Sequence, residues 1–162
     1  MPASRVPRPS PGGRGGLVLS GGGSRGAIDV GFTQALWEAG LRFDVIIGSS
    51  VGALNGAFLA SGRTPEELGR AWLPLRFRDL FRFDWRLLIR GMRARAVYRV
   101  GRRLTRLLAQ LPERFEDLPV PFVAVATDLG AGTPVAFDRG PLLPALLASA
   151  AVPGMWAPVM HQ

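Results

Sequence analysis

The chain has 162 residues, a length that fits one domain, and its 48% hydrophobic and 20% charged residues are typical of a globular protein. Its net charge is +8 and all 20 basic residues are arginines, so the absence of lysine excludes a Schiff base, a serine–lysine pair and a P-loop lysine. The absence of cysteine excludes disulfides, a thiolate nucleophile and cysteine-based metal sites.

Residues 1–15 combine arginine, proline, serine and glycine, without the apolar run of a signal peptide. We interpret them as a disordered basic tail of a non-secreted protein, followed by one domain at residues 16–162. The small apolar stretch from Val45 to Ala60 is shorter than the ~20 residues of a membrane span and contains polar Asn55. We therefore expect a cytoplasmic protein, with peripheral attachment to a membrane as the alternative.

Short apolar runs alternate with helical patterns along the domain. The predicted strands are residues 16–20, 43–48, 121–126 and 134–137. The predicted helices are residues 27–39, 51–60 and 141–151, and a further helix is predicted to start at Thr64-Pro65-Glu66-Glu67. This alternation predicts an α/β fold, a sandwich with a mainly parallel central sheet.

Between residues 70 and 106 the chain contains 12 arginines and only two acids, interleaved with aromatic residues. We expect an Arg/aromatic-rich helical segment at about residues 70–110, made of irregular short helices over the edge of the sheet. Two interpretations of Arg70–Arg106 stay open, a solvated face and a surface that contacts an anionic membrane. Nucleic-acid binding is not expected, because no nucleic-acid motif accompanies the charge.

A Gly-x-Ser-x-Gly motif links the second predicted strand to the next helix, and it comprises Gly48, Ser49, Ser50, Val51 and Gly52. On such a sharp turn, flanking glycines remove Cβ clashes and the helix N-terminus favours developing negative charge. Ser50 is therefore the candidate nucleophile. A plain turn of small residues is the alternative interpretation.

A second glycine-rich turn follows the first predicted strand, and it comprises Gly21, Gly22, Gly23, Ser24, Arg25 and Gly26. It fits the Gly-x-Gly-x-x-Gly pattern of dinucleotide sites, but Asp44 stands at the start of the second strand instead of its end, where the ribose would bind. Dinucleotide binding is therefore the weaker alternative. In a hydrolase, the N–H groups of Gly22 and Gly23 would stabilise an oxyanion, and Arg25 would support the loop or meet a substrate phosphate.

A serine nucleophile needs a general base, and the only histidine, His161, stands one residue from the end of the sequence. Chain ends hold side chains poorly. A serine paired directly with an aspartate is therefore favoured over a Ser-His-Asp triad.

Four blocks of the sequence resemble the patatin-like phospholipase family, in the same order: residues 20–26, 48–52, 126–129 and 148–154. The resemblance covers roughly residues 16–160 and implies a patatin-like three-layer α/β sandwich. It also implies a Ser-Asp dyad with Ser50 as nucleophile, the glycine-rich loop Gly21–Gly26 as oxyanion hole, and no metal or organic cofactor. The implied substrates are phospholipids, lysophospholipids or neutral acylglycerols.

The family's catalytic aspartate lies in an Asp-Gly-Gly or Asp-Gly-Ala block after the Pro-Gly segment, and this sequence contains no Asp-Gly pair. We expect Asp128 to cap a turn, Asp138 to lie in another turn and Asp29 to be exposed on the first helix. The dyad aspartate is thus expected beyond Gln162, in a fold missing its C-terminal part. The alternative is a catalytically incomplete fragment that binds anionic membranes.

Overall fold

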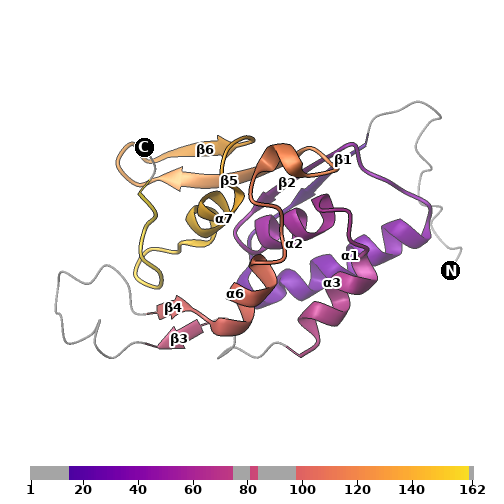
Figure 1. The fold of residues 1–162 in the computed structure, drawn as a ribbon, viewed down its shortest axis with the longest axis horizontal. Helices are drawn as coiled ribbons and strands as arrows, with labels where there is room; N and C mark the ends of the chain where they lie inside the picture. Colours follow the sequence, from indigo (N-terminus) through magenta and orange to yellow (C-terminus); the bar gives the residue numbers. More distant parts are fainter. Residues whose placement is uncertain (1–14, 75–80, 84–97, 161–162) are drawn as a thin grey trace, which may run out of the picture.

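The computed structural model describes residues 15–74, 81–83 and 98–160. Its main sheet has the strand order β1-β2-β5-β6 (Figure 1). These strands are β1 (Gly16–Leu19), β2 (Val45–Ser49), β5 (Phe122–Asp128) and β6 (Thr133–Phe137). β1, β2 and β5 run parallel, and β6 returns antiparallel to β5. The predicted α/β class with a mainly parallel sheet is therefore confirmed.

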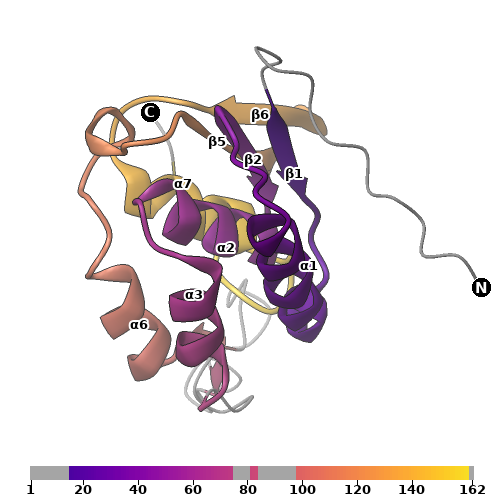
Figure 2. The ribbon, with the colours of Figure 1, turned by 90° about the vertical axis from the view of Figure 1, so that its right-hand side faces the viewer.

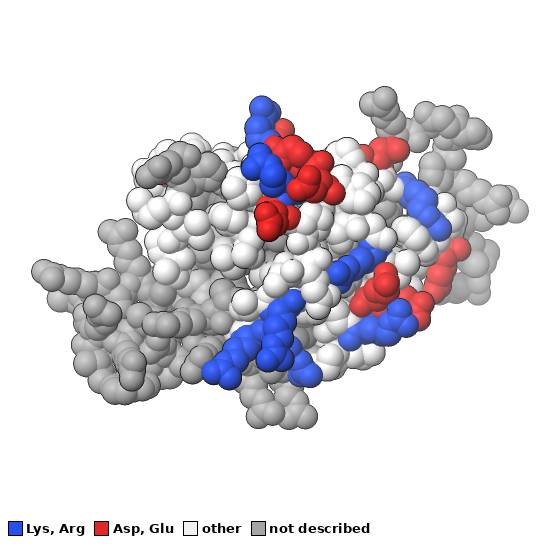
Figure 3. All heavy atoms as spheres, in the orientation of Figure 1, with Lys and Arg blue, Asp and Glu red and all other residues white. Residues whose placement is uncertain are grey.

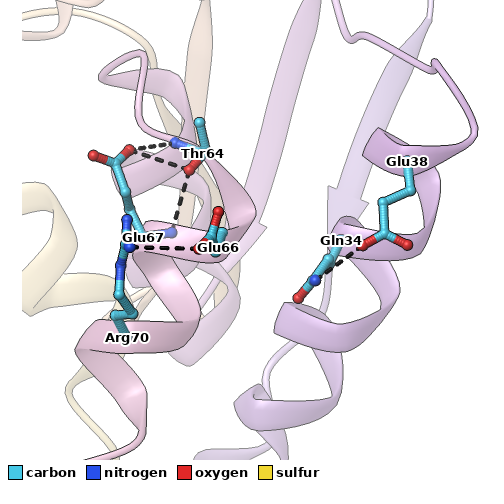
Figure 4. A network of polar contacts seen from close by, with 6 residues as sticks. All are labelled: Gln34, Glu38, Thr64, Glu66, Glu67 and Arg70. Carbon is cyan, nitrogen blue, oxygen red and sulfur yellow. Dashed lines mark hydrogen bonds and ion pairs between the residues drawn. The ribbon is translucent and has the colours of Figure 1, made fainter.

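The predicted helices 27–39, 51–60 and 141–151 and the predicted helix start at Thr64 are confirmed within one residue or so, and one further helix, α6 (Arg102–Leu108), lies in the segment for which only irregular short helices were expected. The other helices are α1 (Gly26–Glu38), α2 (Val51–Ala60), α3 (Pro65–Trp72) and α7 (Leu142–Ala150), with short 3-10 turns at Gly23–Arg25 and Phe115–Asp117. At the start of α3 the Glu67 N–H donates to the Thr64 hydroxyl (3.2 Å) and the Thr64 N–H donates to the Glu67 carboxylate (2.8 Å), as Figure 4 shows. This capping box satisfies two N–H groups that the first helical turn leaves unpaired. No helix in the described part is long and apolar enough to cross a bilayer.

The helices that pack on the main sheet lie on one of its faces (Figure 2). The connections from β1 to β2 and from β2 to β5 step in the same direction, so right-handed crossovers place α1 and α2 on the same side. Alternate strand residues facing these helices are buried: Leu17, Leu19, Ile46, Phe122 and Ala124. On the opposite face Val18 is 69% exposed. The described residues thus supply two layers of the expected three-layer sandwich.

The predicted helical segment at about residues 70–110 is only partly helical. Between α3 and α6, β3 (Phe81–Phe83) and β4 (Tyr98–Val100) form an antiparallel pair that the sequence analysis did not anticipate. Each strand is three residues long, too short for a period of two to be told from a helical pattern. The rest of that prediction, at 75–80 and 84–97, lies outside the described residues, as do residues 1–14 of the tail predicted at 1–15 and His161.

Candidate active site

Ser50 stands on the sharp turn between β2 and α2. Its φ of 53° makes it the one non-glycine residue with a positive φ in the described part of the chain. A non-glycine residue in such a region costs about 1–3 kcal/mol, and strain of this kind clusters at functional sites. A Cβ on Gly48 would lie 2.6 Å from the Cα of Ala53, and one on Gly52 would lie 2.7 Å from the Ser20 carbonyl oxygen. Both glycines of the motif are therefore sterically required for this turn.

The glycine-rich loop lies directly against Ser50. A Cβ on Gly21 would stand 3.2 Å from the Cβ of Ser50 and 4.0 Å from its Oγ. Gly23 has a φ of +59°, and the Arg25 N–H donates to the Gly22 carbonyl (3.1 Å), which folds the loop into its short turn. The two glycine motifs, found separately in the sequence, thus come together. The oxyanion-hole role of the loop stays a prediction.

The backbone of Ser50 is bonded to a second serine, far away in the sequence. Its N–H donates to the Ser149 hydroxyl of α7 (2.8 Å), and that hydroxyl donates to the Val125 carbonyl of β5 (2.6 Å). In the sequence, Ser149 stands only within a block that resembles the family, and no role was predicted for it. Its one local signal is a hydroxyl in a helix otherwise made of leucine, alanine and proline.

Asn55 joins α2 to both neighbouring helices and was also missed. It is 1% exposed, and its Nδ2 donates to the Gly26 carbonyl (3.0 Å) and to the Asp29 carboxylate (3.3 Å). The Trp72 indole N–H of α3 donates to its Oδ1 (2.8 Å). A single amide thereby fixes the elbow helix against the end of the glycine-rich loop.

Asp29 is half-buried, so the expectation that it is exposed was wrong. Burial raises the pKa of its carboxyl, and the hydrogen bond from Asn55 partly opposes this by lowering the pKa. The prediction failed because α2 and α3 both pack on α1 and cover this part of its surface.

An apolar cavity of about 180 Å³ opens beside Ser50. It follows one face of α2, where Ser50, Leu54 and Phe58 recur at helical spacing over ~12 Å. Other walls come from α3, from α6 and the turn that follows it, and from the segment after α7: Leu68, Ala71, Trp72, Leu104, Leu107, Leu108, Leu111, Val152, Met155 and Trp156. Among the described residues that line it, the side chains are apolar apart from Ser50, Asn55 and the indole N–H groups of two tryptophans, and the polar atoms of Asn55 are already hydrogen-bonded.

The other candidate aspartates of the described part lie in turns. Asp128 accepts from the N–H groups of Gly130 (2.7 Å) and Ala131 (3.1 Å), which confirms its predicted turn-capping role. These bonds, that from Ala131 first, hold the pKa of Asp128 below its ordinary value. Asp138 pairs with exposed Arg139 (3.0 Å). None of these contacts brings a carboxylate to the Ser50 hydroxyl.

These features define an α/β protein with a mainly parallel sheet, in which a strained strand-to-helix turn lies between a glycine-rich loop and an apolar cavity. The family model described as patatin-like phospholipase matches residues 17–162. The chain belongs to this family.

Three known proteins illustrate the relationship. An uncharacterized NTE family protein of Mycobacterium tuberculosis is 40% identical over 158 residues, which are 97% of this chain and 42% of that relative. A lysophospholipase, nte1, of Aspergillus terreus is 58% identical over 45 residues, which are 28% of this chain and 3% of that relative. The crystal structure of VipD from Legionella pneumophila resembles the fold with a TM-score of 0.64 and 17% identity, over 89% of this chain and 43% of that one. The chain therefore spans less than half the length of each of these proteins.

Proposed function

We propose that the protein hydrolyses acyl esters of lipids, as a phospholipase A or lysophospholipase, with Ser50 as the nucleophile. The observation that carries this proposal is the position of Ser50, on a strained turn between the glycine-rich loop and an apolar cavity. Membership of the patatin-like phospholipase family supports it and favours it over dinucleotide binding. So does the similarity to a protein named lysophospholipase.

In the proposed reaction, the Ser50 Oγ attacks the acyl carbonyl carbon, and its proton passes to the aspartate expected beyond Gln162. The electron pair of the carbonyl moves to its oxygen, and N–H groups of Gly22 and Gly23 stabilise this oxyanion, at roughly 3 kcal/mol per donor. The alcohol or lysolipid leaves with the proton. Water then attacks the acyl-enzyme, releases the fatty acid and restores the serine.

The cavity suits the acyl chain of the substrate. Its walls are aliphatic and aromatic, and transferring each methylene from water to such a surface contributes about 0.8 kcal/mol. With the ester at Ser50, the chain would run along α2 toward Phe58. The polar headgroup would stay outside the cavity, and Arg25, exposed in the adjoining glycine-rich loop, could meet its phosphate.

Labelling with a fluorophosphonate probe tests the nucleophile. The full-length protein should react, and Ser50→Ala should abolish both labelling and the hydrolysis of a lysophospholipid. Ser61→Ala is the matched control, because Ser61 also lies at an end of α2 but its hydroxyl only donates to the Phe58 carbonyl (2.7 Å). Labelling that survives Ser50→Ala would overturn the assignment.

We also propose that the α6 side of the molecule contacts anionic membranes. Arg102, Arg103 and Arg106 are exposed on α6, whereas Leu104 and Leu108 of the same helix are buried and line the cavity. Figure 3 shows basic side chains gathered over this helix. Replacing the three arginines by glutamine should weaken cosedimentation with anionic vesicles and leave hydrolysis of a soluble ester unchanged. Equal binding to anionic and neutral vesicles would contradict this proposal.

A further inference from the structure

The hydrogen bonds between β2 and β5 reveal an irregularity at Ser50. The strands run parallel with Ile46 opposite Phe122 and Ser49 opposite Val125, and the Ile46 N–H donates to the Pro121 carbonyl (2.9 Å). In a parallel ladder this bond repeats every second residue along both strands. Two repeats further along the strands, this bond would join the Ser50 N–H to the Val125 carbonyl.

The Ser149 hydroxyl occupies that place in the ladder. It accepts from the Ser50 N–H at 2.8 Å and donates to the Val125 carbonyl at 2.6 Å, so it bridges the two groups that a regular ladder would join directly. A direct bond would keep Ser50 in the strand conformation, with a negative φ. The inserted hydroxyl separates the two backbones while leaving neither group unpaired.

We propose that Ser149 is a positioning residue, whose bridging hydroxyl holds Ser50 in the strained conformation that presents its Oγ. This inference rests on the proposed function of Ser50 and deepens it. Only a group that accepts and donates at once can fill this place, and a serine or threonine hydroxyl is the compact side chain that does so.

The orientation of Ser149 argues against an ordinary helical role. Serine in a helix commonly bonds back to the carbonyl one turn earlier. Ser149 instead turns its hydroxyl out of α7 toward β5 and the elbow, across sequence separations of 24 and 99 residues. Thr105 of α6 shows the ordinary alternative, because its hydroxyl donates to the Gly101 carbonyl four residues earlier (3.1 Å).

A matched pair of variants isolates the hydroxyl in the full-length protein. Ser149→Thr keeps the bridging group, whereas Ser149→Val has nearly the same shape and lacks it. We expect the valine variant to have a kcat at least about tenfold below that of the threonine variant, at an unchanged KM for a soluble ester. Amide hydrogen exchange at Ser50 should be about tenfold faster in the valine variant, because its N–H loses its partner.

The outcomes separate this proposal from the assignment of Ser50. If Ser50→Ala abolishes hydrolysis but the threonine and valine variants match in kcat and in Ser50 exchange, Ser149 does not position the nucleophile. If wild-type hydrolysis survives Ser50→Ala, the proposed function fails, and the exchange rates still decide whether the bridge exists. If the β-branched threonine and valine side chains disturb α7, Ser149→Ala, which adds no bulk, takes the place of these two variants. A kcat and a Ser50 exchange rate equal to those of wild type in Ser149→Ala would refute the proposal.

Discussion

The amide of Asn55 offers a sharp test of how the site is held together. Asn55→Leu keeps a similar volume at a position that is 1% exposed, but removes all three hydrogen bonds of the side chain. The Trp72 indole N–H loses its partner, and an unsatisfied buried group costs about 1–3 kcal/mol, whereas the Gly26 carbonyl, at the start of α1, also takes part in the bonds of the helix. Because Asp29 is half-exposed, water can replace its bond. The variant should therefore lose about 1–3 kcal/mol of unfolding free energy.

Urea unfolding of wild type and variants measures this loss by linear extrapolation. Trp72→Phe provides the second arm, because it removes the indole N–H while keeping an aromatic ring on the cavity wall. In the double variant that N–H no longer lacks a partner, so the two losses should fall short of additivity by about 1 kcal/mol or more. A loss below about 1 kcal/mol for Asn55→Leu, or full additivity, would refute the argument that this amide ties the three helices together.

Two further predictions concern the turns. Gly52→Ala should destabilise the fold by about 2 kcal/mol or more and abolish labelling of Ser50, because the new Cβ would collide with the Leu19 and Ser20 carbonyls. Gly31→Ala is the control: its Cβ in α1 would have no atom within 4 Å, so this variant should keep its labelling and be slightly more stable. Asp128→Asn should be less stable than wild type at neutral pH. The pKa of Asp128 in the folded state lies below the ordinary 3.8, so its carboxylate stabilises the fold above that pH, and this contribution disappears as pH falls through the folded pKa. Urea unfolding at stepwise lower pH should therefore show the difference in unfolding free energy between wild type and variant closing. A gap that stays constant with pH would contradict this role.

The sheet and the elbow could be predicted because their signals are local. Apolar runs mark β1 and β2, and Gly48 and Gly52 bracket Ser50 in a spacing that only a tight strand-to-helix turn requires. The partners of the elbow could not be predicted in the same way. Ser149 reaches Ser50 across 99 residues, and whether its hydroxyl points into the helix or across to β5 depends on packing that no local pattern records.

Burial of polar groups was the second limit of sequence reasoning. In the sequence, Asn55 is a polar interruption of an apolar stretch, and it served as an argument against a membrane span. In the structure it is buried and links three helices. Asp29 looked solvent-facing, because a helix pattern shows which residues share a face but not how much of that face its neighbours cover. In both cases the decisive fact is how α1, α2 and α3 pack on one another, which no single helix pattern records.

The energies at Ser50 explain why its conformation needs support from outside the turn. A positive φ at this residue costs about 1–3 kcal/mol. The bridge through Ser149 provides two hydrogen bonds, each contributing about 0.5–1.5 kcal/mol. The cost of the strained φ and the contribution of the two hydrogen bonds are similar in size, and both are small beside the free energy that packing of the core contributes. Loss of the bridge should therefore leave the Ser50 N–H unpaired and Ser50 no longer held in its strained conformation, while the domain stays folded. For this reason kcat and hydrogen exchange at the Ser50 amide, more than global stability, should report the loss.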